Sequence, residues 1–335
     1  MDREHGLPGR VVVLGAGTMG ARIALFLALG GLEVCAAARR PDSLRQAADT
    51  IRSAWPDTSP ADSHEAGTPR VAPGSQARLE EVLARISFTT DADRELARAD
   101  LVIETIAENL TDKLALFERI GAVVRPQAIL TTNTSSLDLT ALAGAVARPG
   151  RFAGLHWFNP ADLVALVEIV PAPATEVSTV RTLERWMTEL GKTPVVLRRA
   201  VPGFVANRLQ YALLREAYAL VAAGVCTPEE ADLTVTSCLG PRWAALGPLQ
   251  CMDLAGLDIH LAVARELFPD LANDTEPPPA VAELVAAGRL GVKSGAGLLG
   301  DYPPQRRDFL ARLRDVTLRS VADAHASVRP VPPPE

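Results

Sequence analysis

A short glycine-rich turn near the N-terminus constrains the fold of this chain more than any other stretch. Gly15, Gly17 and Gly20 have the spacing G-x-G-x-x-G, directly after the β-branched run 11–14. The residues that follow have the apolar spacing of an amphipathic helix, and a second apolar run covers 33–38. A strand, a glycine turn, a helix and a second strand within about 30 residues are typical of a dinucleotide-binding unit. A glycine turn with a purely structural role is the alternative.

Each glycine has its own physical role in such a unit. The first allows the tight turn, the second lets the backbone approach a pyrophosphate, and the third lets the helix pack closely on the strand. The pyrophosphate would lie at the N-terminus of the helix, where unpaired backbone N–H groups favour an anion. The residues expected to bind the cofactor here are Gly15, Gly17, Thr18, Met19 and Gly20.

The end of the second apolar run bears on which dinucleotide binds. An Asp or Glu at this point would bind the ribose 2′-hydroxyl of NAD. This chain has Ala38, Arg39 and Arg40 instead. Two guanidinium groups placed there can pair with a 2′-phosphate. The sequence therefore favours NADP(H) among the NAD(P) cofactors, with two solvated surface arginines as the alternative.

Apolar runs that indicate strands alternate with helical patterns as far as residue 199. The further predicted strands lie at 86–89, 101–106, 128–132, 152–156, 164–170 and 194–197. This alternation predicts an α/β fold with a Rossmann-type doubly wound sheet over residues 1–199. The pattern then becomes helical, with a capping box at Thr227-Pro228-Glu229-Glu230. We therefore expect an all-α C-terminal domain over 200–325. A small domain rich in Leu, Ala and Val has apolar faces left after packing one core, which predicts a dimer interface there. A proline-rich excursion at 56–76 and a disordered tail at 326–335 complete the predicted organisation.

The bulk composition argues against several classes of protein. The formal net charge is −6 without a long basic run, which argues against nucleic acid as a partner. No apolar run approaches the ~18 residues that span a membrane, and residues 1–10 lack the apolar core of a signal peptide. The four cysteines are scattered without a Cys-x-x-Cys pair, so no metal site is expected. Reduced thiols of this kind are typical of a cytoplasmic protein.

The stretch around His156 contains the residues best suited to proton transfer. His156 ends one predicted strand, and Glu168 lies within the next apolar run. A histidine can exchange a proton near neutral pH, and a neighbouring carboxylate can fix its tautomer and orientation. An acid within a buried strand usually has a partner. The sequence therefore predicts a pair of these two residues. The alternative is a histidine hydrogen-bonded in a turn and a glutamate at a strand end.

Taken together, these motifs resemble the 3-hydroxyacyl-CoA dehydrogenase family over about residues 10–300. The matching motifs are the glycine motif at 15–20, Glu108-Asn109-Leu110 with Lys113, Asn133-Thr134-Ser135-Ser136, His156-Trp157-Phe158-Asn159-Pro160 with Glu168, Pro202 to Asn207, and Gly288 to Gly295 with Lys293. The resemblance implies an oxidoreductase that uses NAD(P) and forms a homodimer, with substrate contacts from the helical C-terminal domain.

The resemblance also implies roles for individual residues. His156 would take the proton of a 3-hydroxyl group while hydride leaves C3 for the nicotinamide, with Glu168 as its partner. Fixed donors stabilise charge that develops on oxygen. The implied substrate-binding residues are Ser135, Asn159 and Asn207, and the implied cofactor-binding residues are Glu108, Lys113, Ser135 and Lys293. Ser135 as a helix cap and Asn207 as a solvated helix start are the alternatives.

The chain departs from the family pattern in two places that concern the substrate. No lysine lies between Arg40 and Lys113, where a CoA 3′-phosphate would require cations. The turn at 239–248 resembles the branch that includes lambda-crystallin, a relative of gulonate dehydrogenase acting on a free acid. Arg242 in this turn could bind a substrate carboxylate or lie at the surface. Three functions stay open: a dehydrogenase of a CoA- or carrier-bound 3-hydroxyacyl thioester, a dehydrogenase of a polar free or carrier-bound hydroxy acid, and a cofactor-binding structural protein like the crystallins.

Overall fold

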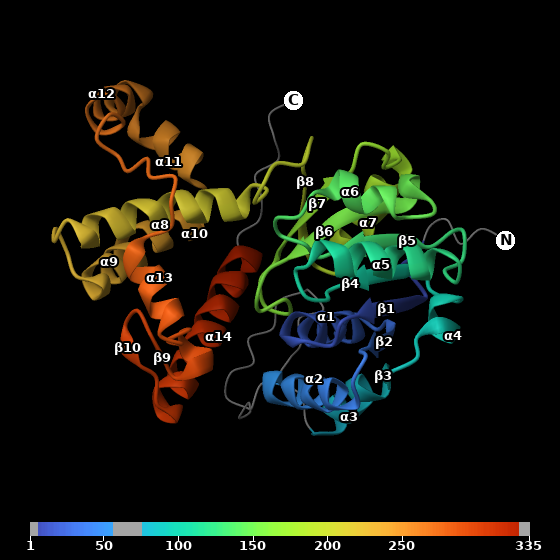
Figure 1. Cartoon of the computed structure of the whole chain (residues 1–335). Helices are drawn as coiled ribbons and strands as arrows, with labels where there is room; N and C mark the ends of the chain where they lie inside the picture. The colour runs from blue at the N-terminus through green and yellow to red at the C-terminus, as the bar shows by residue number, and fades with distance from the viewer. Residues whose placement is uncertain (1–5, 56–75, 328–335) are drawn as a thin grey trace. The chain divides into compact units, whose positions relative to one another are not determined.

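The computed structural model describes residues 6–55 and 76–327 and divides into two compact units, Met1–Val205 and Ala206–Glu335 (Figure 1). The flexible excursion predicted at 56–76 lies outside the described residues except for Gln76, which begins a helix. The tail predicted at 326–335 also lies outside them, except that residues 326 and 327 belong to the last helix.

The first unit is built on an eight-stranded sheet with the order β3-β2-β1-β4-β5-β6-β7-β8. The strands are β1 (Arg10–Leu14), β2 (Glu33–Ala37), β3 (Ile86–Thr89), β4 (Leu101–Glu104), β5 (Ile129–Thr132), β6 (Phe152–Trp157), β7 (Leu166–Pro171) and β8 (Thr193–Val196). Neighbouring strands from β3 to β6 pair in parallel, whereas β7 pairs antiparallel with β6 and parallel with β8. The order of the six parallel strands is that of a dinucleotide-binding doubly wound sheet, which confirms the predicted fold class.

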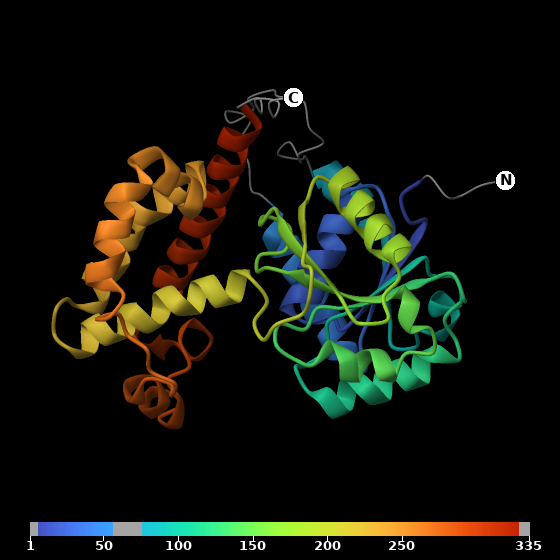
Figure 2. The same cartoon turned by 90° about the horizontal axis from the view of Figure 1, so that it is seen from above.

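Helices cover both faces of this sheet (Figure 2). One face packs against α1 (Thr18–Leu29), α2 (Pro41–Ala54), α3 (Gln76–Ala84) and α7 (Val177–Glu189), and the other packs against α4 (Asp93–Leu96), α5 (Leu110–Gly121) and α6 (Leu139–Gly144). Alternate residues of a strand point to opposite faces. Val11 and Val13 of β1 accordingly join the core cluster of Ile23 in α1, while Val12 joins that of Phe117 in α5.

The direction of the strands brings the candidate site residues to one edge of the sheet. Because β1, β4, β5 and β6 are parallel, their carboxyl ends lie at the same edge. Gly15 follows β1, Glu104 ends β4, Asn133 follows β5, and His156 is the penultimate residue of β6.

The second unit is mainly helical. Its elements are α8 (Ala206–Ala222), α9 (Pro228–Thr234), η3 (Val235–Leu239), α10 (Gly240–Ala245), α11 (Pro248–Ala255), α12 (Leu257–Leu267), α13 (Pro279–Ala286), η4 (Val292–Ser294), β9 (Ala296–Gly297), β10 (Gly300–Asp301) and α14 (Pro304–Ser327). The strands β9 and β10 form a two-stranded antiparallel sheet, which the expectation of an all-α region did not include. The predicted capping box is confirmed, because the side chains of Thr227 and Glu230 each accept the backbone N–H of the other.

The second unit contains little core of its own. Among its residues as far as 327, only Cys251 and Gly297 are buried. Large apolar side chains are exposed instead, and the exposed fractions of Leu249, Leu254 and Phe268 are 82%, 74% and 72%. Within the described residues, no helix has the length and apolar character to cross a membrane.

Candidate active site

The pair predicted at the end of the sheet is formed in the structure. His156 in β6 and Glu168 in β7 are direct cross-strand partners, and their side chains lie on the same face because antiparallel partners do. His156 Nδ1 is 2.8 Å from Glu168 Oε2. Both residues are buried, with exposed fractions of 5% and 1%. A contact of this length in an apolar setting fixes the ring orientation and leaves Nε2 as the ring nitrogen for exchange with a ligand.

Apolar side chains and one backbone amide complete the surroundings of the pair. The ring centroid of His156 is 4.4 Å from that of Phe158 and 5.4 Å from that of Phe204. The other oxygen of Glu168, Oε1, accepts the backbone N–H of Val205 at 3.0 Å. Both carboxylate oxygens therefore have partners, which holds the side chain in one position.

The glycine turn has the geometry that a dinucleotide requires. Gly15 has a φ of 109° and donates its N–H to Ala37 at 2.8 Å, so the chain turns tightly between β1 and α1. A Cβ on Gly20 would lie 1.8 Å from the carbonyl oxygen of Gly15, whereas a Cβ on Gly17 would have no atom within 4 Å. Helix α1 begins at Thr18 without a side-chain cap. Open space beside uncapped backbone N–H groups fits a pyrophosphate.

Arg39 and Arg40 lie between β2 and α2, and both are exposed. Arg40 is the residue that precedes the first turn of α2. The arginines are thus beside the carboxyl end of β2, where the adenosine ribose lies in sheets of this kind.

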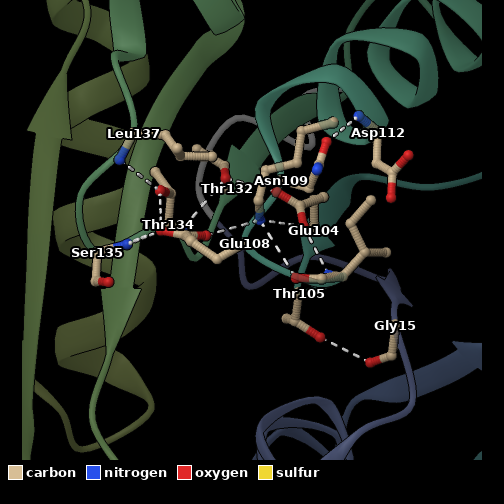
Figure 3. A network of polar contacts seen from close by, with 12 residues as sticks. Gly15, Glu104, Thr105, Glu108, Asn109, Asp112, Thr132, Thr134, Ser135 and Leu137 are labelled. Atoms are coloured by element: carbon tan, nitrogen blue, oxygen red, sulfur yellow. Dashed lines mark hydrogen bonds and ion pairs between the residues drawn. The ribbon is translucent and has the colours of Figure 1, made fainter. Parts of the chain in front are cut away.

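A buried ion pair includes Glu104, the last residue of β4, which lies within the network of polar contacts in Figure 3. Lys113 Nζ in α5 is 2.6 Å from Glu104 Oε1 at the end of β4, and the two side chains are 1% and 0% exposed. Glu104 Oε2 accepts the hydroxyl of Thr132 at 2.6 Å, and Oε1 also accepts the backbone N–H of Ile106 at 2.6 Å. Every oxygen of this buried carboxylate is therefore engaged.

Glu108 connects this ion pair to the loop after β5. Its Oε2 is 3.4 Å from Lys113 Nζ, and its Oε1 accepts the Thr134 hydroxyl at 2.5 Å and the Ser135 backbone N–H at 3.0 Å. Burial alone would raise the pKa of Glu108, but the hydrogen bonds from Thr134 and Ser135 and the charge of Lys113 lower it on balance. A carboxylate that is ionised and tied to its neighbours in this way holds the loop that carries Ser135.

The buried side chains of Arg22 and Lys192 hold the loop that follows β6. Arg22 of α1 binds both carboxylate oxygens of Asp162, at 2.8 and 2.7 Å. Lys192 Nζ donates to the carbonyl oxygens of Ala161 at 2.5 Å and Val164 at 2.6 Å. Burial lowers the pKa of Lys192 to about 7, against the opposing effect of Asp162. The loop that leads from His156 to Glu168 is therefore anchored to both α1 and the start of β8.

The remaining predicted residues divide between the two units. Ser135 is half-buried after β5, and Asn159 is exposed after β6. Asn207 is the second residue of α8, Arg242 lies in α10 and Lys293 lies in η4, all in the second unit. The direct contacts that we expect these residues to make with cofactor or substrate stay predictions. Lys113 was expected to line the cofactor, and in the structure its Nζ contacts Glu104, Glu108 and the carbonyl oxygen of Ile106.

Comparisons with known proteins cover nearly the whole chain. Residues 10–200 match the family model described as 3-hydroxyacyl-CoA dehydrogenase, NAD binding domain, and residues 203–300 match the C-terminal domain of the same family. A Mesorhizobium japonicum protein named 5-formyl-3-hydroxy-2-methylpyridine 4-carboxylate 5-dehydrogenase is 35% identical over 307 residues, 90% of this chain and 93% of the relative. The mitochondrial hydroxyacyl-coenzyme A dehydrogenase of Sus scrofa is 36% identical over 292 residues, 86% of this chain and 89% of the relative.

Solved structures show the same two kinds of relative. The crystal structure of a 5-formyl-3-hydroxy-2-methylpyridine 4-carboxylic acid 5-dehydrogenase, described as an NAD+ dependent dismutase, has a TM-score of 0.83 at 32% identity and covers 96% of this chain and 99% of its own. The (S)-3-hydroxybutyryl-CoA dehydrogenase of Ralstonia eutropha has a TM-score of 0.68 at 32% identity, with 88% and 99% covered.

Proposed function

The chain belongs to the 3-hydroxyacyl-CoA dehydrogenase family and is an NAD(P)-dependent dehydrogenase. We propose that it oxidises the C3 hydroxyl of a 3-hydroxyacyl thioester, carried on CoA or on a carrier protein, with His156 as the general base. The observation that carries this proposal is the buried 2.8 Å contact between His156 Nδ1 and Glu168 Oε2. The intact contact between His156 and Glu168 argues against a purely structural role.

The proposed mechanism assigns one task to each side chain. His156 Nε2 takes the hydroxyl proton as the C3 hydrogen leaves with its electron pair, and the C–O bond becomes a carbonyl. The bound cofactor supplies the hydride acceptor. Glu168 stabilises the imidazolium that forms, because it lies against Nδ1 and its second oxygen is held by Val205. Ser135 and Asn207 are proposed to donate hydrogen bonds to the substrate oxygens, and Asn159 is a further proposed substrate contact.

His156→Gln and Glu168→Gln test this mechanism. Loss of a general base lowers turnover by about 10²–10⁴-fold, so His156→Gln should lose most activity while its Kd for NADH stays near that of the unmodified enzyme. Glu168→Gln keeps the shape of the side chain but not the charge, so its kcat should fall as well. A His156→Gln enzyme with near-normal kcat would overturn the proposal.

We propose NADP(H) as the preferred form of the cofactor. The absence of an acid at Ala38 and the exposed positions of Arg39 and Arg40 beside β2 support this preference. A charge-assisted guanidinium–phosphate contact contributes roughly 1.5–3 kcal/mol, or about ten- to hundredfold in affinity. KM for NADPH should therefore be lower than KM for NADH, and replacing both arginines with alanine should narrow the gap. Equal KM values in the unmodified enzyme would reject the preference.

A compact carboxylated substrate is the second candidate. The higher TM-score of 0.83 for the pyridine carboxylic acid dehydrogenase, against 0.68 for the hydroxybutyryl-CoA enzyme, favours it. Arg242 in α10 is the residue that we propose would bind such a carboxylate. The deciding experiment compares kcat/KM for acetoacetyl-CoA, a carrier-bound acyl group, free hydroxy acids and an aromatic aldehyde carboxylate. Substrates to be reduced are tested with NADH and NADPH, and substrates to be oxidised are tested with NAD and NADP.

We also propose that the second unit forms a homodimer. Its exposed apolar side chains and nearly absent core support this, because small domains bury such surface by association. Light scattering at micromolar concentration should give twice the chain mass, and a monomeric mass would reject the dimer.

A further inference from the structure

Among the described residues, no strand pairs with β6 from Leu155 to Trp157 on the side that faces β5. Pairing between β5 and β6 ends where Thr132 faces Gly154. Strand β6 continues to Trp157 and is paired there with β7 alone. The segment of β6 that carries the proposed base is therefore held by strand hydrogen bonds on only one of its two sides.

The side chain of Asn133 occupies the place of the missing strand contact. Asn133 is the first residue after β5, and its Oδ1 accepts the backbone N–H of Trp157 at 2.8 Å. Its own backbone N–H donates to the carbonyl oxygen of Glu104 at 2.8 Å. One residue thus ties the ends of β4, β5 and β6 together, directly beside His156 and two residues before Ser135.

We propose that Asn133 is a positioning residue that holds the end of β6, and with it His156, in the geometry for proton transfer. The inference rests on the proposed role of His156. A general base must lie within hydrogen-bond reach of the proton it takes, and a misplacement of about 1 Å can cost about 10²-fold in rate. An amide is suited to this position because it supplies an acceptor oxygen on a short side chain.

Variants at Asn133 separate positioning from general stability. Asn133→Leu removes the acceptor with a side chain of similar size, and Asn133→Ser is too short to reach Trp157. Both are expected to lower kcat by about ten- to hundredfold, with Kd for NADH within twofold. Asn133→Asp keeps an oxygen in place and should retain kcat within about threefold of the unmodified enzyme.

A matched control lies at the opposite end of the same strand. Thr175 Oγ1 donates to the carbonyl oxygen of Phe152, the first residue of β6, at 2.6 Å and accepts the N–H of Ala172 at 2.8 Å. Thr175→Val removes both bonds far from His156. It should lower the urea midpoint of unfolding and leave kcat unchanged.

A second measurement is independent of turnover. The chain has five histidines, so ring carbon and nitrogen NMR signals of labelled histidine can be assigned to His156 by comparison with His156→Gln. The His156 signals should shift or broaden in Asn133→Leu and Asn133→Ser and stay unchanged in Thr175→Val. Normal kcat and unchanged His156 signals in a folded Asn133→Leu or Asn133→Ser protein would overturn the inference. Normal kcat in His156→Gln would instead overturn the proposed function, while the NMR result would still decide whether Asn133 positions the ring.

Discussion

The buried ion pair between Glu104 and Lys113 should be strongly coupled to folding. The two charged groups are 2.6 Å apart and almost completely shielded from water. Removal of one partner of such a pair leaves an uncompensated buried charge and typically costs about 3–5 kcal/mol. For Glu104→Gln we expect about 3 kcal/mol, the low end of that range, because Lys113 keeps Glu108 at 3.4 Å. For Lys113→Met we expect about 3–5 kcal/mol, since the charge of Glu104 then has only hydrogen bonds.

The double variant makes the reasoning testable. Glu104→Gln with Lys113→Met removes both charges, and replacement of a buried ion pair by uncharged groups is often neutral or stabilising. The double variant should therefore be more stable than the sum of the single effects predicts, by at least about 2 kcal/mol. The ion pair between Arg119, which is also in α5, and Asp93 is the control for a solvent-exposed pair, because its side chains are 53% and 51% exposed. Arg119→Met should cost less than about 1 kcal/mol.

Urea unfolding followed by tryptophan fluorescence is the assay. Three of the four tryptophans, Trp55, Trp157 and Trp186, belong to the first unit, so the signal reports mainly on the unit that contains the ion pair. The slope of the transition should stay the same among variants, which shows that the change is one of stability. Additive single effects, or single variants that each cost less than about 1 kcal/mol, would refute the argument.

Three further predictions follow from single residues. Gly20→Ala should destabilise the first unit, because the added Cβ would lie 1.8 Å from the carbonyl oxygen of Gly15. Gly17→Ala has space for its Cβ, so its urea midpoint of unfolding should not change, but its affinity for NADH in a fluorescence titration should fall. The pKa of Lys192 is lowered from 10.5 to about 7 in the folded protein, so above pH 7 the unfolded chain binds more protons than the folded chain does. The free energy of unfolding should therefore rise with pH from about 7 to about 10, and this rise should be smaller in Lys192→Met. The pKa of Glu108 is lowered in the folded protein, so its ionised form stabilises the fold above the ordinary glutamate pKa. As the pH is lowered through the glutamate range, the free energy of unfolding should fall more in the unmodified protein than in Glu108→Gln.

The parts of the fold that depend on local pattern could be predicted from the sequence. The strand 86–89 has the predicted bounds, and the capping box at Thr227 forms as expected. The pairing of His156 with Glu168 was also predicted and is present at 2.8 Å. In each case, neighbouring residues or a single buried acid supply the information.

The parts that depend on how distant elements meet were not predicted. Glu104, like Glu168, is an acid within an apolar run, which is the pattern that predicted a partner for Glu168. The partner of Glu104 is evident only in the structure, where Lys113 of α5 contacts the end of β4. The contact of Asn133 with Trp157 depends on where the β5–β6 pairing ends, which no local pattern specifies. The direction of β7 had a usable signal, because the connection 158–165 is shorter than the dozen or so residues that a parallel crossover needs.

The reversed direction of β7 affects how this protein can diverge. His156 and Glu168 meet through the register of two adjacent strands, so their contact does not depend on the length of the connection 158–165. A slip of one residue within the strands would instead move Glu168 to the opposite face of the sheet. The loop can therefore change in length near Asn159, ahead of the anchored residues Ala161 and Asp162, and acquire new substrate contacts, while the two strands that hold the proton-transfer pair tolerate no such change.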